Sequence, residues 1–326
     1  MSTSKVRNLK ATASEAASHL LEAFSNKSLI RRQLIDANQL QKLTLTLNRP
    51  TLDGTDISEH PPSTGTPVPP GYHLVYFTPN GTESELGADG SDTTFNASAP
   101  FTRRMWAGGK MTWAKDVPLC VGDYVEERTK LLSATPKKSK TVGEMVLVDV
   151  EKEFWTPKGL ALTDRRSWVF RPEIDPSIVR NVPEPLENAV PGASLLRDLT
   201  AKANSLGAIR EFRWSPVALF RFSALTFNGH MIHYNQDWTR TVEGHPSLVV
   251  HGPLNLINLL DCWRDIYSKG KSVRDITYRA LSPLYAGETY TARTLRTGGN
   301  WTEEGWEIIL EKDGEICMKS EITAHK

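Results

Sequence analysis

The chain has 326 residues, enough for two domains of ordinary size that each bury a core. Its 39% hydrophobic and 24% charged residues exclude a disordered or fibrous class, and its 39 basic against 38 acidic residues give no reason to expect a nucleic-acid partner. No stretch approaches the roughly 18 uninterrupted apolar residues of a membrane-spanning helix.

The N-terminal segment, residues 1–28, is expected to be a tail. Its first 14 residues carry Lys5, Arg7 and Lys10 and no acidic residue, which is compatible with a mitochondrial transit peptide and equally with a frayed cytosolic tail. A signal-peptide apolar run is absent, so the expected location is the mitochondrial matrix or the cytoplasm and not the secretory route.

The N-terminal half is expected to be mainly strand. A Pro/Gly/Ser/Thr-rich stretch, residues 61–71, predicts a long surface loop. No clear buried helix precedes the expected strands, which lie at residues 110–114, 124–132, 144–153 and 160–170.

An internal repeat indicates that the chain is a duplicated domain. Pro118–Thr129 reappears as Pro283–Thr294, with Pro, Leu, Gly, an acid, Arg and Thr at one fixed offset. Leu45–Pro50 is echoed by Leu225–His230 at a slightly larger offset, and both pairs keep their order. A proline-rich linker, residues 173–190, is expected between the halves.

The C-terminal half begins with two expected helices. Ser215 and Pro216 are typical of a helix start, and this helix should end near Phe227, before Asn228-Gly229. A second helix should start near Gly252-Pro253 and run to about Tyr267. Apolar side chains surround nearly its whole circumference, which predicts that it is buried.

Four expected strands follow, at residues 277–281, 289–296, 306–311 and 316–323, the last two joined by a hairpin at Lys312-Asp313-Gly314. A buried helix followed by an antiparallel sheet that can wrap it is the α+β layering of a hot-dog domain.

Four of the eight histidines lie in one short region: His230, His233, His245 and His251. Imidazoles gathered beside a helix end point to a site, although each alone could be a satisfied surface or core histidine. Zinc binding is the weaker alternative, because no Cys or carboxylate completes a familiar spacing. The cysteines predict reduced core thiols of an intracellular protein, at Cys120, Cys262 and Cys317.

The block Phe220–Tyr234, continued at Val249–Leu254, resembles the signature of MaoC-like hydratases, the group of (R)-specific enoyl-CoA hydratases and hydroxyacyl-thioester dehydratases type 2. The two-domain branch of mesaconyl-C4-CoA hydratase-like proteins, common in fungi and bacteria, is the most similar. Arg103–Gly109 and Gly159–Thr163 match its N-terminal half, and the similarities cover about residues 29–325.

This resemblance implies a double hot-dog fold, in which two tandem antiparallel sheets each wrap a central helix. The domains expected are a degenerate N-terminal hot-dog domain at residues 29–172 and a catalytic C-terminal one at residues 191–326, with the linker of residues 173–190 between them.

The resemblance also assigns roles to the histidine region. The family motif has Asp, Asn and His at the positions of Asn228, His230 and His233, so only His233 is retained as the acid or base. Asn228 cannot ionise and is expected to hold water or a substrate hydroxyl. His230 and His251 are expected to contact the substrate. Gly252, at the start of the buried helix, is expected to offer its N–H to the thioester carbonyl, or else only to permit a tight turn.

The N-terminal half, where Asn48 echoes Asn228 without a following histidine, is expected to have lost catalysis and to serve packing and a substrate tunnel. Trp106 and Gly108 are candidates to line the tunnel, although Trp106 could simply pack in a core. Arg103 and Arg104 could meet a CoA phosphate or be ordinary exposed arginines.

The expected function is therefore hydration of an enoyl thioester, or dehydration of a 3-hydroxyacyl thioester, with no metal and no redox cofactor. The expected partner is a CoA or acyl carrier protein thioester, and a homodimer is compatible with this function. An isomerase, cyclase or thioesterase on the same fold is one alternative, because fold does not fix function. A non-catalytic acyl-binding protein is the other, and loss of turnover without His233 would discriminate these classes.

Overall fold

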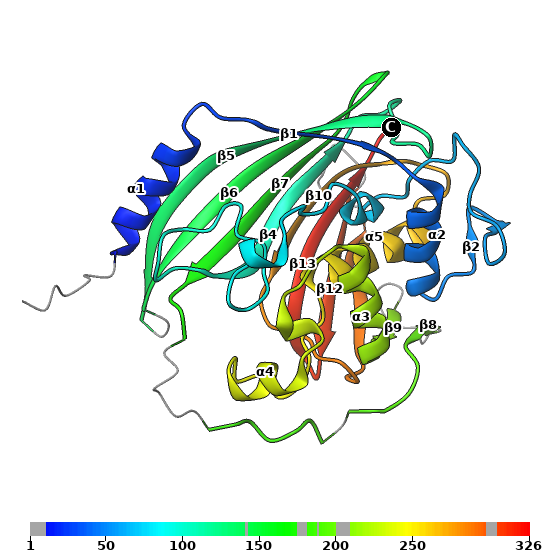
Figure 1. The fold of residues 1–326 in the computed structure, drawn as a ribbon. Coiled ribbons are helices and arrows are strands. Elements are labelled where there is room, and N and C mark those ends of the chain that lie inside the picture. Colours follow the sequence, from blue (N-terminus) through cyan, green and yellow to red (C-terminus); the bar gives the residue numbers. More distant parts are fainter. Residues whose placement is uncertain (1–10, 141–142, 175–180, 188, 200–208, 298–304) are drawn as a thin grey trace, which may run out of the picture.

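A computed structural model describes residues 11–140, 143–174, 181–187, 189–199, 209–297 and 305–326. Its main feature is one eleven-stranded sheet in the order β1-β5-β6-β7-β4-β10-β13-β12-β11-β9-β8 (Figure 1). Each half of the chain builds one part of this sheet. The basic residues expected in the tail, Lys5, Arg7 and Lys10, lie outside the described residues, as do residues 175–180 and 188 of the expected linker.

Long strands form the N-terminal part of the sheet. Buried and half-buried side chains alternate along nearly all of β6, as expected for a strand with one face on a core. Three strands, β4, β5 and β6, are longer than predicted from sequence, β7 has nearly its predicted bounds, and β1 was not predicted. The strands are β1 (Leu29–Leu34), β4 (Arg103–Trp113), β5 (Tyr124–Ser139), β6 (Gly143–Thr156) and β7 (Gly159–Arg171).

The C-terminal part contains the four predicted strands and two short ones that the sequence analysis did not predict, β8 and β9. The hairpin between β12 and β13 is confirmed: Asp313 and Gly314 both have positive φ, 50° and 81°, which suits the right-handed twist of paired strands. The strands are β8 (Leu195–Leu199), β9 (Ile209–Arg213), β10 (Val273–Ala280), β11 (Tyr290–Thr297), β12 (Gly305–Lys312) and β13 (Glu315–Ala324).

The buried helix of the C-terminal half is confirmed with its predicted bounds, as α5 (Gly252–Tyr267). Every residue from Leu254 to Trp263 is buried, because the helix packs against β11, β12 and β13. The helix predicted before it is α3 (Pro216–Leu225), where the Ser215 hydroxyl accepts a hydrogen bond from Ala218 N at 3.1 Å. A short helix, α4 (Gln236–Thr241), lies between them.

The described N-terminal half has no long central helix. At the place where α5 precedes β10, the segment before β4 holds only the 3-10 turns η1 (Tyr72–Val75) and η2 (Glu83–Glu85) and irregular backbone. The remaining elements are α2 (Ala37–Thr46) and the small pair β2 (Thr51–Leu52) and β3 (Thr55–Asp56). The N-terminal sheet therefore wraps loops rather than a helix.

Residues 1–28 are not only a tail. Residues 13–24 form α1 (Ala13–Phe24), which starts with a capping box between Thr12 and Glu15 and lies on β5 and β6 (Figure 1). Its buried face, Ala13, Ala16, Ala17 and Leu20, joins a separate hydrophobic cluster with residues of β5, β6 and β7. Small apolar residues allow this close contact, which charge patterning alone does not reveal.

The two parts of the sheet meet where β4 pairs antiparallel with β10. Gly108 lies at this junction, and a Cβ atom there would come within 2.5 Å of the Tyr278 carbonyl oxygen. Glycine is thus required for close approach of two backbones.

The two halves share a repeat, but the segments Leu45–Pro50 and Leu225–His230 align in the structure with a shift of one residue from their alignment in sequence. Asp36 and Ser215 occupy the same N-cap position of α2 and α3. Arg49 N donates to Thr44 O just as Asn228 N donates to Ser223 O. The counterpart of Asn228 is therefore Arg49 and not Asn48. Arg49 forms an ion pair with Asp265 at 2.6 Å.

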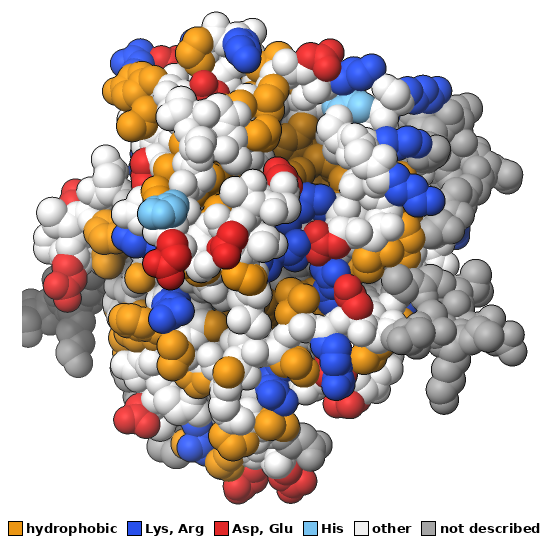
Figure 2. Space-filling model, turned by 90° about the vertical axis from the view of Figure 1, so that its right-hand side faces the viewer, with side chains coloured by type: hydrophobic (Ala, Val, Ile, Leu, Met, Phe, Trp, Pro, Cys, Tyr) orange, Lys and Arg blue, Asp and Glu red, His pale blue; other side chains and the backbone are white. Residues whose placement is uncertain are grey.

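Basic and acidic side chains intermix on the face shown in Figure 2, where several Lys and Arg side chains gather in a central hollow. Among the described residues, no helix has the length and apolar character that crossing a bilayer requires. Cys262 and Cys317 are buried thiols as predicted, whereas Cys120 is only partly buried, contrary to the expected core position.

Candidate active site

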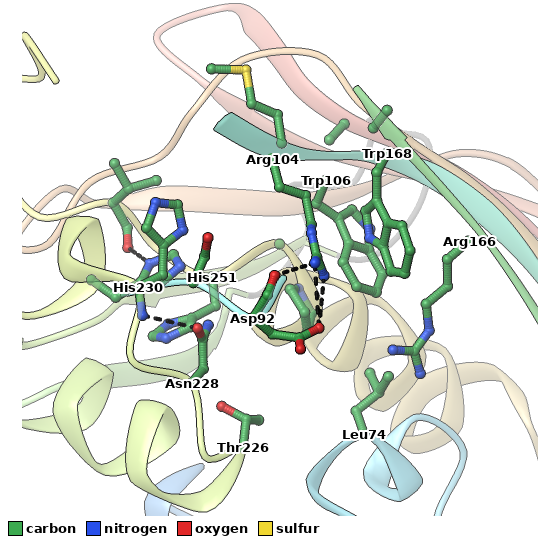
Figure 3. A pocket seen from close by; sticks show the side chains of 18 of the residues that line it. Leu74, Asp92, Arg104, Trp106, Arg166, Trp168, Thr226, Asn228, His230 and His251 are labelled. Atoms are coloured by element: carbon green, nitrogen blue, oxygen red, sulfur yellow. Dashed lines mark hydrogen bonds and ion pairs between the residues drawn. The ribbon is translucent and has the colours of Figure 1, made fainter. Parts of the chain in front are cut away.

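A cavity of about 580 Å³ lies between the two halves of the chain (Figure 3). Strands β4, β6 and β7 and the loop before β4 line it from the N-terminal half. The loop after α3 and the start of α5 line it from the C-terminal half. It brings together most of the residues predicted from sequence: Asn228, His230, His233, His245, His251, Gly252, Arg104 and Trp106.

His233 closes the short 3-10 turn η3 (Met231–His233) and is 7% exposed. Its Nδ1 lies 2.7 Å from the Val249 carbonyl oxygen, so Nδ1 carries the proton and donates it. Burial, and after it the neighbouring His230, lowers the pKa of His233 to about 3. His233 is therefore neutral at pH 7, with the lone pair of Nε2 free to accept a proton.

His251 supports His233 from behind. The two imidazole rings are stacked with centroids 3.6 Å apart and an interplanar angle of 17°. The Ser223 hydroxyl lies 2.9 Å from His251 Nε2, and His251 is 1% exposed. Burial, with His233 as the next cause, holds the pKa of His251 well below its usual range. Two neutral stacked rings fix the plane of His233, so His251 is a support as well as a lining residue.

The N-terminus of α5 opens into the cavity. His251 is the N-cap residue, yet its side chain makes no capping hydrogen bond, and Pro253 follows Gly252. The first-turn N–H of Gly252 thus lacks a side-chain acceptor and lies at the positive end of the helix dipole. A Cβ atom on Gly252 would come 3.1 Å from Cγ of Trp106. Trp106 therefore packs across the helix start as well as lining the cavity.

Asn228 follows α3 and lines the cavity near the same histidines (Figure 3). Its Oδ1 accepts a hydrogen bond from His230 N at 3.1 Å, while its own backbone N–H donates to Ser223 O at 2.8 Å. The side-chain oxygen is thus engaged, and the amide nitrogen is the group that can donate to a reactant. Asn228 orders the histidine loop and is also part of the cavity wall.

His230 faces a carboxylate from the other half of the chain. Its Nε2 lies 3.4 Å from Asp89 Oδ2, and its ring meets that of His233 edge to face with centroids 5.4 Å apart. Burial lowers the pKa of His230, and the charge of Asp89 opposes that effect. Sequence analysis identified His230 but missed Asp89, which lies far from it along the chain.

The two arginines and Gly108 lie in different places relative to the cavity. Arg103 is not among the cavity residues and pairs with Glu243. Arg104 lines the cavity, but it binds Asp92 and stacks 4.7 Å from the centre of the Trp168 ring (Figure 3). Both guanidinium groups thus have a carboxylate partner in the structure, and their contact with a CoA phosphate stays a prediction. Gly108 lies at the sheet junction and not on this cavity.

His245, the fourth histidine of the group, lines the cavity with its Nδ1 3.2 Å from the Tyr285 hydroxyl. Among the residues that the structure describes, no three His, Cys, Asp or Glu side chains gather as metal ligands would. In the cavity, His233 and His251 stack on each other, His245 contacts a hydroxyl and His230 faces a carboxylate.

Charged residues on the N-terminal side of the cavity were also missed. Arg166 lies 5.5 Å above the Trp106 ring and is paired with Asp164 at 2.6 Å, and Lys152 pairs with Glu127 at 3.0 Å. These residues are flanked by other charged or polar ones along β5, β6 and β7 and look like ordinary strand residues in sequence. The structure shows that Glu127, Lys152 and Arg166 line the cavity.

Comparison with known proteins assigns the family. Residues 71–286 match the family described as hydroxyacyl-thioester dehydratase type 2. The chain is 29% identical to mesaconyl-C(4)-CoA hydratase of Chloroflexus aurantiacus over 69% of this chain and 73% of that protein. It is 27% identical to the mitochondrial hydroxyacyl-thioester dehydratase type 2 of Schizosaccharomyces pombe, over 73% and 81%.

A solved structure of similar architecture is that of a Mycobacterium tuberculosis protein with a double hot-dog fold. Its TM-score is 0.52 at 13% identity, and the match covers 92% of this chain and 96% of that one. The expected α+β double hot-dog fold is confirmed, with both sheets joined through β4 and β10.

Proposed function

The chain belongs to the hydroxyacyl-thioester dehydratase type 2 family and is a hydro-lyase of acyl thioesters, and we propose that it interconverts 3-hydroxyacyl and trans-2-enoyl thioesters in the cavity between its halves. The observation that carries the proposal is the buried His233, whose Nδ1 is bonded to Val249 O and whose ring stacks on His251, the N-cap residue of α5. We assign catalysis to the C-terminal half, residues 191–326, and part of the acyl tunnel to residues 29–172.

His233 is the proton-transfer residue in this proposal. In dehydration its Nε2 accepts a proton from the α-carbon of the 3-hydroxyacyl thioester; in hydration it returns that proton to the same carbon. The hydrogen bond from Nδ1 to Val249 O fixes the tautomer, and it also stabilises the imidazolium that forms. Stacking on His251 keeps the ring from rotating away.

The helix start supplies the second requirement of the reaction, which is a donor to the thioester oxygen. Negative charge develops on this oxygen when the α-proton leaves. The Gly252 N–H, at the positive end of α5, is placed to donate to it. Trp106 packs against Gly252 and lines the cavity, so it provides an apolar wall beside this donor.

The proposal is tested by incubating the purified protein with crotonyl, longer enoyl and mesaconyl thioesters of CoA and of acyl carrier protein, and following the absorbance of the conjugated thioester. Parent protein should hydrate at least one substrate and His233→Ala should not. His325→Ala is a matched control, because His325 Nε2 also bonds a backbone carbonyl, Trp113 O at 2.9 Å, outside the cavity.

Equal rates in the parent and His233→Ala would reject the site assignment. The ratio of CoA to carrier-protein rates identifies the physiological carrier of the acyl group. The homodimer stays a prediction, which light scattering of the purified protein tests.

A further inference from the structure

A turn of the N-terminal half is locked onto the histidine loop of the C-terminal half. The turn holds Asp89, Gly90 and Ser91, and Met231 N donates to Asp89 O at 2.8 Å. A Cβ atom on Gly90 would come 2.1 Å from the Gly229 carbonyl oxygen, so only glycine permits this approach. The two backbones fit together immediately beside His230.

The Asp89 carboxylate is directed by this turn toward His230. Its Oδ1 accepts hydrogen bonds from the Ser91 amide at 2.9 Å and the Ser91 hydroxyl at 2.6 Å. Its Oδ2 lies 3.4 Å from His230 Nε2. Asp89 is 9% exposed, and a carboxylate removed from water in this way normally has a cationic or hydrogen-bonded partner.

The reaction requires a second proton-transfer group, because the hydroxyl that leaves the β-carbon must be protonated while the α-proton is removed. Asn228 cannot ionise. His230 lines the same cavity and its ring touches the edge of His233. We propose that His230 is a second catalytic residue, which exchanges a proton with the reactant hydroxyl, and that Asp89 of the N-terminal half is its positioning residue.

The proton balance closes within the pair of histidines. In dehydration, His233 takes the α-proton as the carbon–hydrogen bond breaks, while His230 gives its proton to the hydroxyl as the carbon–oxygen bond breaks, releasing water and the enoyl thioester. Hydration reverses both transfers. The pair carries one proton more than two neutral imidazole rings before and after each step: it sits on His230 before dehydration and on His233 after it. Mutual repulsion of two imidazolium ions disfavours a second extra proton.

The groups around His230 act on its protonation in opposite directions. Asp89 and Glu243 favour its protonated form, whereas burial, Arg103 and Arg104 disfavour it, and burial is the largest effect. Arg103 is paired with Glu243 and Arg104 with Asp92, so Asp89 is the carboxylate that adjoins the ring without an arginine partner among the described residues.

This inference rests on the proposed function, and the decisive variant is Asp89→Asn. Asparagine keeps the oxygen that accepts from Ser91 but removes the charge. We expect kcat to fall at least about tenfold, less than the roughly hundredfold expected for His230→Gln, which removes the acid itself. KM and the thermal midpoint should stay close to those of the parent. The double variant should be no slower than His230→Gln, because Asp89 acts through His230.

The pH profile discriminates a positioning role from a structural one. Turnover requires that one ring of the histidine pair is an imidazolium, so rates fall at high pH when this extra proton is lost. Removing the Asp89 charge should move that alkaline limb to lower pH. Asp275→Asn is the control, because Asp275 also accepts a hydrogen bond from a hydroxyl, that of Thr112 at 2.7 Å, but lies outside the cavity. The alkaline limb of the pH profile of this variant should not move.

An unchanged alkaline limb in Asp89→Asn, or an additive loss in the double variant, would overturn the proposal. Should the parent hydrate no thioester, the NMR titration of the His230 ring still decides: its midpoint should fall in Asp89→Asn, and an unmoved midpoint would also overturn the pairing. Failure of the proposed function is seen separately, as absence of turnover in the parent.

Discussion

Replacing His233 by Gln should make the stability of the protein less sensitive to acid. The pKa of His233 is lowered from 6.5 to about 3, first by burial and then by His230. The unfolded chain, with the ordinary pKa, binds more protons than the folded one between these values. The free energy of unfolding therefore falls as the pH drops from about 6.5 toward 3. Above pH 6.5 both states are neutral at this site, and this loss of stability is absent.

The magnitude follows from the two pKa values. At pH 5 protonation of the unfolded chain at this site costs the folded state about 2 kcal/mol, whereas at pH 7 the cost is a few tenths. A glutamine amide can still donate to the Val249 carbonyl but does not titrate. Between pH 7 and pH 5, His233→Gln should thus lose about 2 kcal/mol less stability than the parent. His230 and His251 remain and give a residual slope.

Urea unfolding followed by tryptophan fluorescence at pH 7 and pH 5 measures this difference. Leu248→Val is a suitable control, because it weakens the same buried region without removing a titrating group. It should show the parent's loss of stability between the two pH values. Parallel pH dependences of the parent and His233→Gln would refute the argument that His233 is buried in its neutral form.

Four other variants test the site and the core. His233→Ala should lower turnover at least about a hundredfold with an unchanged circular dichroism spectrum, the usual scale for a lost general acid or base. Asn228→Asp should keep measurable hydratase activity with a changed pH profile between pH 5 and 9. Asn228→Leu should be nearly inactive, because a polar reactant would face an apolar side chain. Full activity in the Leu variant would show that Asn228 only orders the loop and does not contact the reactant. Leu260→Ala should lower the free energy of unfolding, measured in urea, by roughly 2 to 5 kcal/mol, since the Leu260 side chain on α5 is only 1% exposed.

Local signals in the sequence were sufficient for the central helix of the C-terminal half and for the strands that follow it. The apolar circumference of residues 252–267 predicts a buried helix, and the Gly-Pro start and the following strands fix its bounds. The histidine block adjoins that helix in sequence, so its meeting with Gly252 in the cavity could be anticipated. Short sequence separation makes such contacts predictable.

Contacts between distant segments could not be predicted in this way. Asp89 looks like an ordinary turn residue before glycine, and nothing near it in sequence indicates a histidine of the other half. Gly108 was expected to line a tunnel, but its lack of a side chain serves backbone contact between β4 and β10. In both cases the contacted residue lies in the other half of the chain, and a glycine or aspartate alone does not identify it.

The alignment of Arg49 with Asn228 shows how the two halves differ in chemistry. Because Arg49 and not Asn48 matches Asn228, the N-terminal counterpart of the site carries a permanent cation, which Asp265 of α5 neutralises. That position cannot exchange protons near pH 7 and instead ties the N-terminal half to the central helix of the other half.

The absence of a long central helix in the described N-terminal half has a direct consequence for the site. A second α5-like helix would lie inside the curve of β4 to β7, where the cavity now extends to Lys152 and Arg166. The loop that stands in its place is free to approach the histidines, and it delivers Asp89 to His230. Loss of one hot-dog helix therefore both opens room for an acyl group and brings a carboxylate to the catalytic half. A duplicated fold can in this way assemble one active site from two unequal copies.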